Sequence, residues 1–161
     1  MLKERLRIRS LEKRDFELFR DLQSNVAVRE FLGGIVEPER IESKFNEFLN
    51  SITLGDFHFV VEVDESKSGI ISLSKHIDSG EVELSFQFLP QFWGEGIARQ
   101  SCEQVINKAF HELKASKVVS ETQKRNIRSR AMIEKLGMVQ LSVAKRFGEE
   151  QVIYELRGDK L

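Results

Sequence analysis

The amino-acid sequence predicts an α/β protein in which helices flank a central, mostly antiparallel sheet with one parallel strand pair. The first reason is a change of hydrophobic spacing, from helical before residue 57 to alternating over 57–88, and back to helical after 97. The second reason is that no linker, repeat or low-complexity tract divides residues 1–161, so we expect a single domain. The composition, 40% hydrophobic and 32% charged, is that of an ordinary soluble globular chain.

The first third of the chain predicts a strand followed by helices. Residues 6–9 alternate as a short strand does. Asp15 stands where it can cap a helix, and Pro38 suits the first turn of another. Residues 26–32 resemble a further helical turn, stopped by two glycines. The two main helices carry apolar residues at helical spacing, namely Phe16, Leu18, Phe19 and Leu22 in the first and Ile41, Phe45, Phe48 and Leu49 in the second.

The middle of the chain predicts a meander of three strands. Residues 57–63 are apolar at every second position, which is the period of a strand. Turn signals at 64–69 and 78–80 separate this strand from two more, expected at 70–77 and 82–88. The last of the three alternates apolar and polar side chains, so it should have one buried and one polar face.

The last third returns to alternating helices and strands. The expected order is helix, strand, helix and a closing hairpin of two strands, over residues 97–113, 118–123, 127–136, 138–144 and 151–156. Gly137 suits the position after a helix end. The strand, helix and strand across 82–123 form a crossover, which should make its two strands parallel and the connection right-handed.

Charge and cysteine content narrow the classes of function. The formal net charge of −1 gives no global field for nucleic acid or an anionic membrane, and we expect neither as a partner. Cys102 is the only cysteine, which excludes an internal disulfide and fits a reducing compartment. No apolar signal segment or membrane span of about 20 residues is present, so we expect a cytoplasmic protein. His58, His76 and His111 lack metal-ligand spacing, and we expect no metal.

Two glycines, Gly94 and Gly96, stand between an expected strand and an expected helix. Glycines allow close approach to the backbone, and the first N–H groups of a helix attract anions, so this loop suits a phosphate or diphosphate. A phosphate-binding loop of the Gly-Lys-Ser/Thr type does not match, and Arg99 stands where a dinucleotide fingerprint needs a small residue. The pattern Q/R-x-x-G-x-G/A does match, starting at Gln91. A tight turn without a ligand is the alternative.

Two sequence blocks resemble the GNAT superfamily of N-acetyltransferases. Residues 82–98, VELSFQFLPQFWGEGIA, resemble its acetyl-CoA-binding segment and are most similar to the branch of ribosomal-protein-alanine N-acetyltransferases. Residues 126–138, NIRSRAMIEKLGM, resemble a second stretch, with Met138 for the usual phenylalanine. The opening at 6–19 also resembles the start of that branch, and the expected element order agrees over nearly the whole chain.

The resemblance implies an acetyl-CoA-dependent N-acetyltransferase that moves the acetyl group directly to an amine. Acetyl-CoA would be the co-substrate, with the backbone of 86–88 paired to its pantetheine arm and N–H groups around 93–98 on its diphosphate. An N–H near Phe88 would stabilise the oxyanion of the intermediate. The residues that the resemblance assigns to acetyl-CoA binding are Phe86, Gln87, Phe88, Gln91, Trp93, Gly94, Glu95, Gly96, Ile97, Ala98, Arg99, Asn126, Ser129 and Arg130.

Two residues are the expected catalysts. Glu83 lies on the polar face of its strand and is the best candidate for the base that deprotonates the amine, directly or through a water; a solvated surface carboxylate is the alternative. Ser129 could protonate the departing thiolate, or be an ordinary helix-surface hydroxyl. Asn126 could likewise contact pantetheine, cap its helix, or both. Phe86 replaces the family's common tyrosine and Ser85 its common glycine, so no chemistry of a tyrosine hydroxyl carries over.

Other residues receive lesser roles. His76 is a second candidate base, Cys102 is expected in the core rather than as a nucleophile, and Tyr154 is expected to pack. Arg130 is the member of a basic cluster expected to meet a CoA phosphate, and residues 31–35 are expected to form a wall of the acceptor pocket. The acceptor is a protein N-terminus or a small amine. A non-catalytic acyl-CoA sensor and a dinucleotide-binding protein are the alternatives, and both monomer and homodimer stay open.

Overall fold

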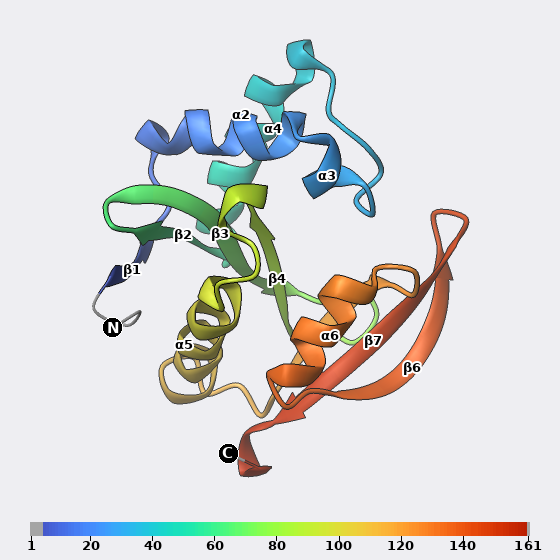
Figure 1. Cartoon of the computed structure of the whole chain (residues 1–161). Helices are drawn as coiled ribbons and strands as arrows, with labels where there is room; N and C mark the ends of the chain where they lie inside the picture. Colours follow the sequence, from blue (N-terminus) through green and yellow to red (C-terminus); the bar gives the residue numbers. More distant parts are fainter. Residues whose placement is uncertain (1–4, 161) are drawn as a thin grey trace.

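The computed structural model describes residues 5–160, which form one seven-stranded sheet with helices on both faces (Figure 1). The strand order is β1-β2-β3-β4-β5-β7-β6. Only β4 and β5 pair in parallel among these strands, which confirms the predicted mixed sheet. The strands are β1 (Leu6–Ser10), β2 (Phe57–Val63), β3 (Ser66–Lys75), β4 (Val82–Phe88), β5 (Lys117–Gln123), β6 (Val139–Arg146) and β7 (Glu149–Arg157).

The helices divide between the two faces of the sheet, as Figure 1 shows. The α-helices are α2 (Phe16–Ser24), α3 (Val26–Arg29), α4 (Pro38–Thr53), α5 (Ile97–His111) and α6 (Ile127–Lys135). The described residues also form three short 3-10 turns: η1 (Lys13–Asp15), η2 (Pro90–Phe92) and η3 (Gly158–Lys160).

Two buried apolar clusters fix these layers. Val60 and Ile70, which are partners in neighbouring strands, pack against α2 and α4. Val61 and Ile71 point the other way, because successive side chains of a strand alternate, and they belong to the larger cluster with α5 and α6. The apolar spacing read from the sequence therefore predicts which side of each element is buried.

Several element bounds differ from the sequence-based expectation, and the largest differences are at β3, α3 and the closing hairpin. β3 begins at Ser66, not residue 70, because Asp64 and Glu65 make the whole turn with φ of 47° and 66°. α3 ends at Arg29, ahead of the expected end at 32. The closing hairpin is longer than expected, since only Phe147 and Gly148, at φ of 53° and 77°, separate β6 from β7.

Asp15 occupies the predicted N-cap position of α2, but its side chain does not cap that helix. No side-chain hydrogen bond from Asp15 caps α2, and its carboxylate is fully buried. It instead pairs with the guanidinium of Arg9 at 2.8 Å and the ammonium of Lys67 at 2.7 Å, and accepts the backbone N–H of Glu12 at 2.8 Å. These donors hold the pKa of Asp15 well below its usual range against the opposing effect of burial. A buried charge of this kind is stable only when it is paired.

Candidate active site

The parallel strands β4 and β5 part after a short contact. They are paired only at Val82 with Val118 and at Glu83 with Val119. The other edge of β4 is paired with β3 along its whole length, and the other edge of β5 is paired with β7. In the described part of the chain, residues 85–88 therefore have a neighbouring strand on one edge and an opening on the other.

The backbone groups that face this opening follow from the strand geometry. The C=O of Glu81 and the N–H of Leu89 bond to the β3 side, at 2.8 and 2.9 Å. Backbone direction alternates along a strand, so the residues of even number turn their N–H and C=O toward β5. Leu84, Phe86 and Phe88 are these residues, and the last two lie beyond the β4–β5 contact.

Side-chain contacts confirm this direction. The Ser120 hydroxyl of β5 donates to the Leu84 carbonyl at 2.9 Å, where the strands begin to part. The indole N–H of Trp93 donates to the Phe88 carbonyl at 2.8 Å, at the far end. The N–H and C=O of Phe86 and the N–H of Phe88 are the β4 groups between these contacts. They form a short strand edge that can pair with an extended, amide-containing chain.

The glycine loop lies at the wide end of the opening. Gly94 and Gly96 have φ of 86° and 78°, a conformation that favours glycine, and a Cβ on either would meet nothing within 4 Å. The glycines thus serve the backbone conformation of the turn. Gly96 is the N-cap of α5, a helix of 15 residues, and it has no side chain that could accept a hydrogen bond. The first N–H groups of this helix are therefore left without a side-chain cap. Such a helix start attracts an anion.

Trp93 and α6 stabilise this loop. The guanidinium of Arg128 stacks on the Trp93 ring at 4.1 Å from its centre, which joins the start of α6 to the loop after β4. Ile97 is fully buried and belongs to the larger apolar cluster, so its expected contact with the cofactor stays a prediction. Five members of the expected binding set are exposed, namely Gln91, Gly94, Glu95, Gly96 and Arg99. The Arg99 guanidinium pairs with the carboxylate of Glu103 in the next turn at 2.9 Å.

The second sequence block forms the start of α6. Asn126 caps this helix, since its side-chain oxygen accepts the N–H of Ser129 at 3.1 Å. Arg130 donates to the Tyr154 hydroxyl at 3.0 Å and to the Lys124 carbonyl at 3.1 Å, and the first of these bonds raises its pKa. Asn126 and Arg130 thus have structural partners, and a role of either toward a ligand stays a prediction.

Glu83 lies at the apex of the opening, at the last β4–β5 pair. Its side chain is 24% exposed, and burial raises its pKa, opposed by the nearby His76. The nearest His76 nitrogen lies 3.9 Å from the carboxylate and binds Glu121 at 2.8 Å. Arg146 in turn binds Glu121 at 2.6 Å. A raised pKa makes a half-buried carboxylate a stronger base than an exposed one, which suits it to accept a proton.

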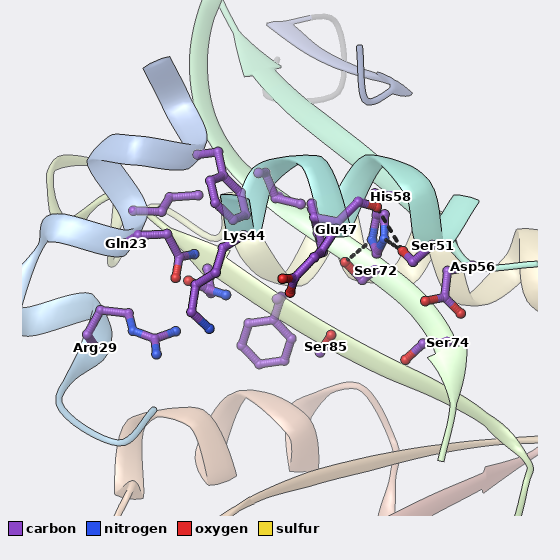
Figure 2. Close-up of a pocket in the computed structure, with 16 residues that line it drawn as sticks. Gln23, Arg29, Lys44, Glu47, Ser51, Asp56, His58, Ser72, Ser74 and Ser85 are labelled. Atoms are coloured by element: carbon purple, nitrogen blue, oxygen red, sulfur yellow. Dashed lines mark hydrogen bonds between the residues drawn. The ribbon is translucent and has the colours of Figure 1, made fainter. Parts of the chain in front are cut away.

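A cavity of about 430 Å³ opens on the face of β4 that carries the Glu83 side chain, although Glu83 is not one of its lining residues (Figure 2). Its floor is formed by β2, β3 and β4, and its walls by α2, α3 and α4. Ser85, Phe86 and Gln87 bring β4 into its lining. The side chain of Gln87 therefore faces the cavity, although its expected role was toward the cofactor. Its amide oxygen is buried and has no hydrogen-bond partner.

The wall of this cavity includes a buried histidine. His58 is hydrogen-bonded to the hydroxyls of Ser51 and Ser72 at 2.7 Å each and stacks on Phe48 at 3.5 Å (Figure 2). Burial lowers its pKa to about 4, so it is uncharged at neutral pH. None of residues 31–35 lines this cavity, and their expected place in a wall of the acceptor pocket stays a prediction.

Two further expectations concern the core. Cys102 is fully buried and burial raises its pKa, so it is a core residue, as predicted, and no nucleophile. Tyr154 is also buried and donates to Glu134 at 3.0 Å, in line with the predicted packing role. Within residues 5–160, no cluster of three acidic, histidine or cysteine side chains could hold a metal ion, and no helix is long and apolar enough to cross a membrane.

Comparisons with known proteins agree with this geometry. The model of the acetyltransferase (GNAT) domain matches residues 5–139. The chain belongs to the GNAT acetyltransferase family. This membership confirms the class of enzyme predicted from the sequence, an acyltransferase that uses acetyl-CoA in N-acetylation.

Relatives of known sequence include an uncharacterized N-acetyltransferase, YnaD, of Bacillus subtilis, 22% identical over 84% of this chain and 79% of that protein. The FsC-acetyl coenzyme A-N(2)-transacetylase of Aspergillus fumigatus is 33% identical over 40% of this chain, and the match covers only 27% of that longer protein.

Solved structures share the fold over nearly the whole chain. A GNAT-family acetyltransferase from Bacillus anthracis has a TM-score of 0.83 at 21% identity, with 96% of both chains covered. A spermidine N-acetyltransferase from Vibrio cholerae, solved with CoA and spermine, has a TM-score of 0.81 at 19% identity, with 98% of both covered. An acetyl transferase from Salmonella typhimurium that modifies the N-terminal serine of ribosomal protein L7/L12 has a TM-score of 0.84 at 12% identity, with 98% of this chain and 97% of that one covered.

The structure also brings together residues that the sequence reasoning missed. Glu121 and Arg146 lie with His76 around Glu83, and Arg29 and Lys44 line the cavity. They lie on separate elements, and no short motif links them. Finding them requires the strand register and the placement of the helices, which a single sequence does not specify.

Proposed function

We propose that the protein transfers an acetyl group from acetyl-CoA directly to an amine that enters through the cavity, with Glu83 as the base. The observation that carries this proposal is the parting of β4 from β5, which leaves a free backbone edge beside the start of α5 and next to a half-buried carboxyl. A strand edge, an anion site and a base are the three groups that this reaction needs.

These groups fit acetyl-CoA. The pantetheine arm is extended and contains amides, so it can pair with the edge at Phe86 and Phe88. The diphosphate then meets the N–H groups of 94–98 at the start of α5. Trp93 and Asn126 hold the loop and α6 on either side of the arm. Ser129, next to this path, is within the first turn of α6.

The chemistry begins at the amine, because an ammonium has no lone pair with which to attack. Glu83 accepts its proton, directly or through one water, and the nitrogen bonds to the thioester carbon. The Phe88 N–H stabilises the resulting oxyanion. The carbon–sulfur bond breaks, and the thiolate takes a proton from Ser129. The second proton lost by the nitrogen restores that hydroxyl through solvent, so each turnover releases one proton from the original ammonium.

The acceptor belongs to the range seen among structural neighbours, from a small amine such as a polyamine to a protein N-terminus. We also propose that one domain takes in residues 1–161, since β6 and β7 extend the sheet beyond the matched residue 139. The cytoplasmic location and the choice between monomer and homodimer stay predictions. So do the expectations of no nucleic acid and no membrane as partners.

Two measurements test this proposal. In a thermal-shift comparison, CoA and acetyl-CoA are expected to raise the melting temperature and NAD is not. In an amine panel with acetyl-CoA, thiol release is then expected from the wild type and from Glu42→Gln, an exposed control on α4. Glu83→Gln should lower kcat about 10²-fold or more, with CoA binding retained.

Three results would contradict parts of this proposal. If CoA gives no stabilisation at saturating concentration, the cofactor site is wrong. If CoA binds but no amine releases thiol, the non-catalytic sensor is the better account. Full turnover of Glu83→Gln at neutral pH removes Glu83 from the chemistry and leaves the transferase standing.

A further inference from the structure

Four charged side chains line the cavity, two of them positive and two negative. Arg29 of α3 and Lys44 of α4 are cationic, and Glu47 of α4 and Asp56 after it are anionic. In Figure 2, Arg29 and Lys44 lie toward one end with Gln23, and Asp56 lies toward the other. Since His58 is uncharged, the lining has no net charge at neutral pH.

Arg29 is a fixed cation that has no counter-ion among residues 5–160. Its Nε donates to the Gly34 carbonyl at 2.9 Å and one terminal nitrogen to the Leu32 carbonyl at 2.5 Å. These bonds hold the guanidinium in place but do not neutralise it. Burial lowers its pKa, and no carboxylate of the described residues lies within ion-pair distance. A half-buried cation in this state is stabilised by an anion from outside the chain.

Lys44 adds a second charge at the same end. It is half-buried and, among residues 5–160, it has no ion-pair partner within 4 Å, although Glu47 is one turn along the same helix. Gln23, 6% exposed, lines this end beside the two cations. Two cations and an amide are suited to a carboxylate, because a guanidinium binds its two oxygens at once.

A separate polar group of the cavity lining lacks a hydrogen-bond partner. The buried side-chain oxygen of Gln87 has no hydrogen-bond partner, and only a donor can satisfy it. Gln87 lies on β4 next to Phe86, whose backbone faces the opening between the strands. An amine N–H bonded to Gln87 therefore lies beside the strand edge at which the acetyl group would be delivered.

We propose that the acceptor is an amine that also carries a carboxylate, an amino acid or a close analogue, with the carboxylate at Arg29 and Lys44 and the amine at Gln87. This proposal rests on the proposed function and names its substrate class. A polyamine fits less well, because its several positive charges would meet two unneutralised cations and only two carboxylates, one of them exposed.

The test uses matched pairs of acceptors that differ only in the anion. Glycine, alanine, phenylalanine, glutamate and 4-aminobutyrate are each compared with their primary amides, with spermidine as the polyamine. Thiol release from acetyl-CoA gives kcat/KM. At least one acid is expected to exceed its amide about tenfold or more, since a charged hydrogen-bonded pair is replaced by a neutral one.

Variants assign this preference to the cavity. Arg29→Gln is expected to lower kcat/KM for the acid about tenfold and for the amide less than about threefold. Arg29→Lys should retain part of the preference. Arg20→Gln, which removes an exposed arginine on α2, is the control and should leave both unchanged.

A binding measurement separates this proposal from the failure of catalysis. With CoA bound, the N-acetylated acid should raise the melting temperature of the wild type more than the N-acetylated amide, and Arg29→Gln should lose the difference. That result supports the substrate class even if no acceptor turns over. Equal use and equal binding of acid and amide would overturn it while leaving the transferase intact. Preferred use of spermidine, lost in Glu47→Gln and Asp56→Asn, would overturn it in favour of a polyamine.

Discussion

Acidification should destabilise the protein through His58, a buried residue of the cavity wall. Its side chain is 4% exposed, and its pKa falls from the ordinary 6.5 to about 4 in the folded protein. Each pKa unit corresponds to about 1.4 kcal/mol, so this difference corresponds to about 3 kcal/mol. Because the unfolded chain binds the proton more readily, the contribution is full above pH 6.5 and is lost as pH falls from 6.5 through 4.

The assay is urea unfolding at intervals across this pH range, with the pKa of the ring followed by NMR. His58→Gln, which cannot titrate, should show a pH dependence of unfolding free energy that is flatter by about 3 kcal/mol over the range. His111→Gln, at an exposed position, is the matched control and should follow the wild type. A ring pKa above 6, or equal pH dependence in wild type and His58→Gln, would refute the reasoning.

Three further predictions concern the buried ion pair and the cofactor loop. Asp15→Asn should cost about 3–5 kcal/mol of unfolding free energy in urea, because two cations lose a buried partner; a loss below 1 kcal/mol would contradict this. Gly96→Ala should cost about 1–2 kcal/mol and weaken CoA binding in calorimetry, because φ there is 78°; unchanged stability and affinity would show the turn to be tolerant. Arg128→Gln should shift the fluorescence of the single tryptophan, Trp93, and weaken CoA binding about threefold through loss of the stacked cation; an unchanged spectrum would argue against the stacking.

Most of the fold could be predicted because hydrophobic spacing records which face of each element is buried. The alternation over 57–63 and the helical period after Ile97 both correspond to elements of the structure. The bounds were less accurate where turns depend on special backbone conformations. Asp64 and Glu65 take positive φ without being glycine, so the start of β3 carried no clear signal. Asp15 holds the predicted N-cap position, but its ion pairs with Arg9 and Lys67 could not be predicted, because a capping residue and a buried ion-pair partner look alike in sequence.

The site was predictable only in part, for a related reason. The loop at 93–98 could be found because glycine chemistry is local, and Glu83 because it stands on a polar strand face. The cavity that we propose for the acceptor depends on side chains brought together from six helices and strands, including Arg29 and Lys44. The backbone of Gln87 was expected to pair with the cofactor along with its neighbours, but alternation along β4 turns its N–H and C=O toward β3, and its side chain lines the cavity.

The central claim is that acetyl-CoA binds in the opening between β4 and β5, and backbone NMR of a CoA titration tests it most directly. The amide signals of Phe86, Phe88 and residues 94–98 are expected to shift together and to saturate together, with NAD giving no such change. If CoA shifts amides elsewhere and leaves those signals in place, the parted strands are not the cofactor site.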